Sequence, residues 1–88
     1  MAHLNQLRRA VVYALDHGWR RDPYHRQLVC RAWPSGRARG IVIHMSDTIR
    51  PRLLTVNELD RTGGRPVSIR RAITVLRAEY DEHGEPLA

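Results

Sequence analysis

Residues 54–80 read LTVNELDRTGGRPVSIRRAITVLRAEY, and this stretch decides the fold. Thr55 is followed three residues later by Glu58, which is the capping-box signature of a helix start. The signature predicts a short helix over about 56–61. Gly63-Gly64 then predicts a turn, because glycine tolerates the left-handed backbone that ends a helix.

A second, longer helix is predicted over residues 66–80. Pro66 favours its first turn because the fixed φ of proline suits a helix start. Apolar residues recur at helical spacing at Ile69, Ala72, Ile73, Leu76 and Tyr80. At about 100° per residue, the opposite side carries Val67, Arg71, Thr74 and Ala78, flanked by Arg70 and Arg77. The segment is therefore predicted to bury its aliphatic side and to offer arginine to a polyanion.

The run ELDRTGGRPVSIRRAITVL, residues 58–76, resembles the helix-turn-helix of bacterial and phage DNA-binding proteins. The matching elements are Glu58-Leu59, Thr62-Gly63 and Ile69–Ile73. The alternative interpretation is a short helix, a loop and an ordinary amphipathic C-terminal helix. The resemblance implies a small transcription regulator that binds double-stranded DNA. One half-site gives little specificity, so such proteins often act as dimers.

In a helix-turn-helix protein the second helix enters the major groove, and other residues hold the phosphates. The resemblance therefore implies a binding site with two parts. The residues that would face the groove are Val67, Ser68, Arg71 and Thr74. Arg65 and Arg70 would contact phosphates.

A helix and a β-hairpin are predicted before this stretch. Residues 3–17 have one apolar face, and Gly18 should end that helix with Trp19 folded back onto its last turn. Residues 25–33 and 40–45 alternate as two strands, joined by a turn cluster. In the first strand Leu28, Cys30 and Ala32 should face inward and Gln27, Val29, Arg31 and Trp33 outward. In the second strand Ile41, Ile43 and Met45 should face inward.

The predicted tip of the hairpin, residues 33–40, carries Arg37 and Arg39. Two arginines on such a loop resemble the wing of winged-helix proteins, which lies along the nucleic-acid backbone. The resemblance implies that Arg37 and Arg39 clamp the flanking phosphates. A plain solvent-exposed hairpin tip is the alternative. Residues 53–56 are a candidate for a further short strand.

Charge is the strongest global signal of the sequence. The 88 residues carry fifteen basic side chains, all arginine, and a net charge of +6. Four of the nine acidic residues lie in the last ten positions, so the body of the chain is more basic than its net charge suggests. Such a field attracts nucleic acid or acidic protein surfaces. A second hypothesis is therefore a small phage-type interaction protein that binds an acidic host protein.

The predicted order of elements also resembles that of HicA-type mRNA interferases. That order is a helix, Gly-Trp, a strand with a histidine near its start, a turn, a strand and a helix. This family has a double-stranded-RNA-binding-like fold, and Gly18-Trp19, His25 and residues 69–80 occupy the corresponding places. The resemblance implies an RNA-binding ribonuclease as a third hypothesis. The Gly-Ser-His motif of the family is replaced here by Pro23-Tyr24-His25, so enzyme activity is not expected and no catalytic residue is assigned.

Together, these elements predict one small α+β domain. It consists of an N-terminal helix, a β-hairpin, and a helix-turn-helix with a long C-terminal helix. The domain should span residues 1–80, and 81–88 should be a flexible acidic tail. A single cysteine forbids an internal disulfide, and the histidines lack metal-ligand spacing, so neither metal nor cofactor is expected. No apolar run approaches 18 residues, and no export signal is recognisable, which favours a cytoplasmic protein without membrane contact.

Overall fold

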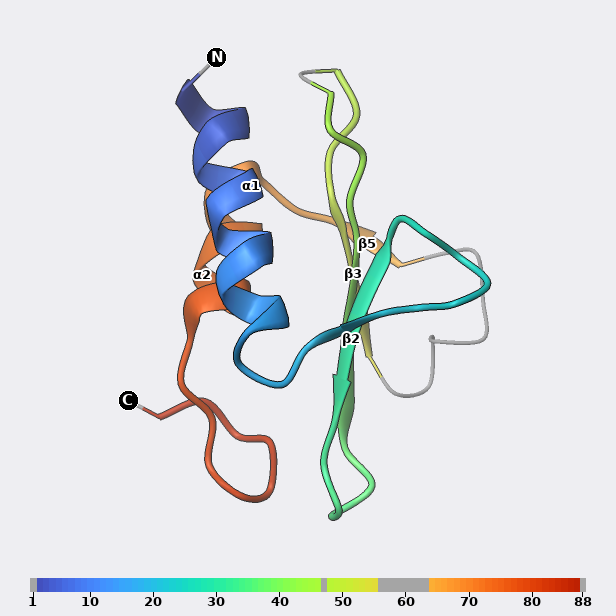
Figure 1. The fold of residues 1–88 in the computed structure, drawn as a ribbon, viewed down its shortest axis with the longest axis vertical. Helices are drawn as coiled ribbons and strands as arrows, with labels where there is room; N and C mark the ends of the chain where they lie inside the picture. Colours follow the sequence, from blue (N-terminus) through green and yellow to red (C-terminus); the bar gives the residue numbers. More distant parts are fainter. Residues whose placement is uncertain (1, 47, 56–63, 88) are drawn as a thin grey trace.

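The computed structural model describes residues 2–46, 48–55 and 64–87, and within them the chain is an α+β protein, as predicted. Five antiparallel strands form one sheet in chain order, and two helices lie side by side on one of its faces (Figure 1). The elements are α1 (Ala2–Leu15), β1 (Arg20–Arg21), β2 (Leu28–Ala32), β3 (Ala38–Val42), β4 (Arg52–Thr55), β5 (Arg65–Pro66) and α2 (Ile69–Arg77).

The first helix forms where its apolar spacing predicts. Leu7, Val11 and Ala14 recur on one face of α1 and are buried against α2 and the sheet. Gly18, at a φ of 98°, ends the helix. The Trp19 amide donates to the Ala14 carbonyl at 3.0 Å, and only 2% of Trp19 is exposed. The predicted folding back of Trp19 is confirmed.

Strands β2 and β3 form the predicted hairpin, but the side chains of β2 alternate in the opposite phase. Val29 pairs with Ile41, and both are fully buried in the cluster beneath the helices. The prediction that Cys30 and Ala32 face inward is wrong, because Cys30 is half-buried and Ala32 is exposed. Leu28 is buried but lies outside that cluster. Neighbouring apolar residues at 28 and 29 allow either phase, and the pairing with Ile41 selects one.

Two further residues of the hairpin differ from prediction. Trp33, expected to face outward, is 7% exposed. Met45, expected inside, is 40% exposed, although Ile41 and Ile43 are buried as predicted. The strand β3 ends at Val42, so Met45 no longer follows the alternation of the sheet.

The stretch predicted as a helix-turn-helix, residues 58–76, contains the strand β5. The predicted short strand exists as β4, and it pairs with β5. The predicted first helix, 56–61, lies outside the described residues. The predicted start of the second helix at Pro66 is wrong, because Pro66 pairs with Arg52 at an edge of the sheet. The helix begins at Ile69, and Ser68 caps it by accepting a hydrogen bond from the Arg71 amide at 3.0 Å.

The second helix buries a slightly different stripe from the predicted one. Ala72, Val75 and Leu76 are buried, whereas Ile69 and Ile73 are only half-buried against the core. The helix is therefore rotated relative to the predicted orientation, with its buried side centred on Ala72. The arginines still lie on its solvent side.

The helix ends at Arg77, three residues before the predicted end. The backbone of Ala78 is extended, with a ψ of 148°. Beyond it, the Tyr80 hydroxyl donates to the Val75 carbonyl at 2.8 Å and so satisfies a carbonyl of the last helical turn. Tyr80 thus belongs to the segment after the helix.

Residues 80–87, called the C-terminal turn below, fold back on the sheet. Residues 81–87, predicted to be a flexible tail, form hydrogen bonds in the structure. The Asp81 carboxylate accepts hydrogen bonds from the His83 and Glu85 amides at 2.8 and 3.0 Å. The Leu87 amide donates to the Glu79 carbonyl at 2.8 Å. Side-chain hydrogen bonds of this kind fix a short acidic segment that has no apolar stripe of its own.

Candidate nucleic-acid interface

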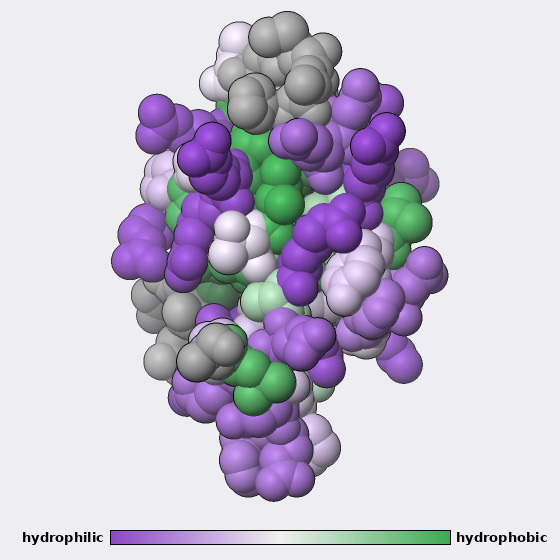
Figure 2. Space-filling view, turned by 90° about the vertical axis from the view of Figure 1, so that its left-hand side faces the viewer, coloured by the Kyte–Doolittle hydropathy of each residue, from purple (hydrophilic) through white to green (hydrophobic). Residues whose placement is uncertain are grey.

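The exposed side of the helix pair carries positively charged side chains and no negatively charged ones. The sequences of α1 and α2 contain no acidic residue. Their arginines, all exposed, are Arg8, Arg9, Arg70, Arg71 and Arg77, and these residues define the helix-pair face. Among the described residues no carboxylate lies within ion-pair distance of these guanidinium groups. Figure 2 shows hydrophilic side chains over most of this side of the molecule, around a narrow apolar strip.

The start of α2 concentrates positive charge. Arg70 and Arg71 lie in its first turn, which has no acidic residue. The amino end of a helix already carries a partial positive charge, so arginine there does not compensate the helix dipole. The Ser68 hydroxyl occupies one free amide, that of Arg71. An anion bound at this turn would relieve the remaining repulsion.

The far end of the helix-pair face carries an aromatic contact. The Arg77 guanidinium lies 5.1 Å from the centre of the Tyr13 ring. Tyr13 in turn stacks on His17, with ring centres 3.9 Å apart. Sequence reasoning missed this cluster because it joins α1 and α2. Arginine over an aromatic ring is a favourable arrangement, and such surfaces also accept nucleobases.

The predicted groove-facing residues are only partly brought together. Ser68, Arg71 and Thr74 lie exposed on or beside α2, and the Thr74 hydroxyl donates to the Arg70 carbonyl at 3.0 Å. Val67 is half-buried and packs against the core, so it is not placed to face a groove. Arg65 is exposed on β5.

The hairpin tip lies at the opposite end of the molecule from the start of α2 (Figure 1). The tip is shorter than predicted, because the Trp33 amide donates to the Arg37 carbonyl at 2.9 Å and β3 begins at Ala38. Arg39 therefore belongs to the strand and not to the tip. The structure therefore places the hairpin tip, which carries Arg37, apart from the start of α2.

Both hairpin arginines are engaged by the C-terminal turn. Arg37 Nη2 lies 2.5 Å from Glu85 Oε1. Arg39 donates to the Gly84 carbonyl through Nε at 3.3 Å and Nη2 at 3.1 Å. The Arg39 guanidinium also lies 5.0 Å from the centre of the Tyr80 ring. The helix-pair face differs sharply, because no described carboxylate reaches its arginines.

His25 is exposed on the loop between β1 and β2, which lies on the side of the sheet away from the helices (Figure 1). The Asp22 carboxylate organises that loop by accepting hydrogen bonds from the Tyr24 and His25 amides at 2.9 and 2.8 Å. Burial, and secondarily the Asp22 charge, raises the pKa of the Cys30 thiol, which keeps it protonated and poorly nucleophilic.

Neither a metal site nor a membrane-spanning helix is found in the described part of the chain. No group of three or more His, Cys, Asp or Glu side chains is placed there to hold a metal ion. Neither α1 nor α2, as described, has the length and apolar character needed to cross a bilayer. Comparison with known protein families, curated proteins and solved structures gives no match to this chain.

Proposed function

We propose that this protein binds double-stranded RNA through the helix-pair face, mainly by contacts with phosphates. The observation that carries the proposal is a helical layer with several exposed arginines and no carboxylate. Phosphate contacts by arginine supply most of the affinity of nucleic-acid binding and do not depend on sequence. Arginine suits this role because its planar fork donates two parallel hydrogen bonds.

The width of the helix pair favours binding across a surface over insertion into a groove. Each helix with its side chains is about 10 Å across, so two helices side by side present about 20 Å. The major groove of B-DNA is about 12 Å wide and admits a single helix. Here α2 packs against α1 along its buried side and does not stand clear of it. A DNA-binding regulator that reads bases with α2 would need that helix to enter the groove alone.

Duplex RNA offers a surface that matches a broad, basic face. The A-form minor groove is wide and shallow, and it displays phosphates and 2′-hydroxyl groups to proteins that recognise shape. The order of a helix, Gly18-Trp19, a sheet and a final helix also follows the layout expected from the resemblance to the double-stranded-RNA-binding-like fold. The position of His25 on the other side of the sheet supports binding over cleavage.

The proposal is tested by the salt dependence of binding to a 16-base-pair RNA duplex and a DNA duplex of the same sequence. The variant R70Q/R71Q should flatten the slope of log affinity against log salt by about 2, because each arginine removed leaves roughly one phosphate without its cation. The variant R26Q/R50Q removes the same charge from exposed loops outside the helix pair and is the matched control. It should change the slope much less.

Four outcomes would overturn the proposal. Equal effects of the two double variants would mean that only net charge matters. Tighter binding to one DNA sequence than to duplex RNA would support the DNA-binding regulator. If neither duplex bound at low salt, the acidic protein partner would become the favoured hypothesis. Cleavage of the RNA that is abolished in H25A would instead support the ribonuclease.

A further inference from the structure

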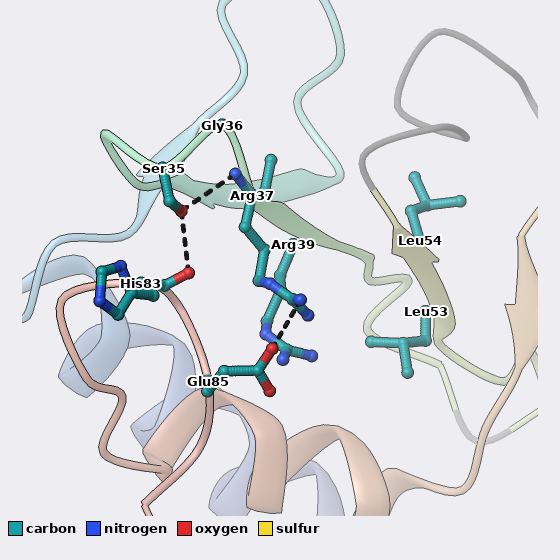
Figure 3. A pocket seen from close by; sticks show the side chains of 9 residues that line it. Ser35, Gly36, Arg37, Arg39, Leu53, Leu54, His83 and Glu85 are labelled. Carbon is teal, nitrogen blue, oxygen red and sulfur yellow. Dashed lines mark hydrogen bonds and ion pairs between the residues drawn. The ribbon is translucent and has the colours of Figure 1, made fainter.

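A second region of interest lies between the hairpin tip and the C-terminal turn. A pocket of about 480 Å³ opens there, lined by β3, β4 and the turn. Figure 3 shows the guanidinium groups of Arg37 and Arg39 pointing into this pocket toward Glu85. His83 lines the same pocket, and Glu85 is the single carboxylate among its described lining residues. The pocket is therefore an arginine-rich site with one acidic occupant.

The contacts in this pocket are those that an anion would make. Glu85 offers a carboxylate oxygen to Arg37, and the Gly84 carbonyl accepts two hydrogen bonds from Arg39. A phosphate group presents several oxygens with the same accepting character, and arginine forks bind them in pairs. The Ser35 hydroxyl donates to the His83 carbonyl at 2.9 Å and fixes the turn against the tip.

We propose that this pocket is a phosphate-binding site, called the tip site, and that Glu85 occupies it in the free protein as an internal competitor. The phosphate can come from a nucleic-acid backbone or from a free polyphosphate. The inference extends the proposed function, and it rests on that function only for the nucleic-acid source. It also explains how Arg37 can serve as the predicted backbone clamp although the chain's own carboxylate holds it.

The ion pair between Arg37 and Glu85 is weak enough for a phosphate to replace the carboxylate. The side chains of Arg37 and Glu85 are 47% and 51% exposed. Ion pairs between half-exposed side chains are screened by water and contribute little, so a ligand with several negative charges can displace the carboxylate. The backbone of the turn stays in place because Asp81 and Leu87 bind it independently of the Glu85 side chain. Displacement therefore requires only that the Glu85 side chain swing into solvent.

The variants E85Q and E82Q separate competition from net charge. Both remove one negative charge from the same turn, but among the described residues the ion-pair partner of Glu82 is His83, at 3.4 Å, and not an arginine of the pocket. Inorganic pyrophosphate is the first probe. Its binding is monitored by the NMR signals of the Trp33 indole N–H and the Gly84 amide, which lie beside the site. The affinity for pyrophosphate, measured from the shifts of these signals, should increase by as much as about fivefold in E85Q. The increase in E82Q should be smaller. The gain should vanish when R37Q is added to E85Q.

A duplex RNA titration of the same variants identifies the source of the phosphate. A gain for RNA in E85Q that R37Q abolishes would assign the tip site to the nucleic-acid backbone. A gain in affinity for pyrophosphate alone would assign the tip site to free polyphosphate. The proposal for the helix-pair face would then be decided by its separate binding experiment. Equal gains in E85Q and E82Q, or no pyrophosphate response at the Trp33 and Gly84 signals, would overturn the tip site even if the helix-pair face binds RNA.

Discussion

The helix-pair face and the hairpin tip use the same side chain in opposite ways. On the helix pair, Arg70 and Arg71 are exposed and have no acidic partner among the described residues. On the hairpin, Arg37 and Arg39 are held by a carboxylate and a carbonyl of the C-terminal turn. An arginine in a sequence therefore predicts a positive charge, but it does not show whether that charge is free to bind a ligand. Availability depends on which distant segment packs beside it.

The stability of the two regions also comes from different sources. The helix pair rests on a continuous apolar core, in which Leu7, Ile41 and Leu76 are almost completely buried. The C-terminal turn has hydrogen bonds, the ion pair of Glu85 with Arg37 and the packing of Gly84 on Trp33. The helix-pair face should accordingly be the more rigid of the two, and the turn the more easily displaced.

The largest expected effect comes from the core beneath the helix-pair face. L76A should lower the free energy of unfolding by about 2–5 kcal/mol, because a fully buried leucine leaves a cavity. V12A removes an aliphatic group that is 60% exposed on α1, and it should cost about 0.5 kcal/mol or less. Urea denaturation measures both. Similar costs for the two variants would show that α2 is not packed as described.

A smaller effect is expected where the C-terminal turn meets the hairpin. Gly84 and Gly36 both have a positive φ, 87° and 94°, so alanine is strained at either position. At Gly84 an added Cβ would also lie 2.8 Å from the buried Trp33 ring, whereas at Gly36 it would meet nothing within 4 Å. G84A should therefore cost about 1–3 kcal/mol more than G36A in thermal or urea unfolding.

G84A also tests the link between the C-terminal turn and Arg39 of β3. It should shift the Trp33 indole signal and release Arg39 from the Gly84 carbonyl, whereas G36A should leave both unchanged. Equal destabilisation by the two variants would mean that backbone strain alone acts and that the turn does not pack on Trp33.

The smallest expected effect is a pH dependence of the turn. Hydrogen bonds from the Glu85 and His83 backbone lower the pKa of Asp81 below its usual value. The ionised carboxylate thus stabilises the turn above the pKa of the unfolded chain, about 4, and this contribution disappears as the pH falls through the lowered value. Trp33 fluorescence should report the opening below pH 4, before the helices melt by circular dichroism.

D81N is the control for this pH dependence. The asparagine oxygen can still accept the two amide hydrogen bonds, but it does not titrate. The acid-induced change in Trp33 fluorescence should therefore be weaker in D81N. An unchanged profile would show that another group opens the turn.

Much of the fold could be predicted from the sequence where one local signal acts alone. The apolar stripe of α1, the Gly18 cap and the hairpin were found in this way. The start of α2 was misplaced because Pro66 fits both a first helical turn and an edge strand, and pairing with Arg52 decides between them. Local patterns do not contain that pairing.

The candidate site was less predictable because it depends on contacts between distant segments. Arg70, Arg71 and Thr74 are exposed on α2, as helical spacing predicts, although the buried stripe of the helix differs from the predicted one. The engagement of Arg37 by Glu85 could not be foreseen, because the acidic end of the chain has no periodic signal. The opposite charges of the two segments were the only available hint.

The most direct test is NMR mapping of the protein during titration with a 16-base-pair RNA duplex at low salt. If the helix-pair face binds the duplex, the largest shifts should occur at the amides of Ser68–Arg71 and Arg8–Arg9, with smaller ones around Trp33. Shifts confined to the loop that carries His25, or the absence of any shift in α1 and α2, would contradict binding through the helix-pair face.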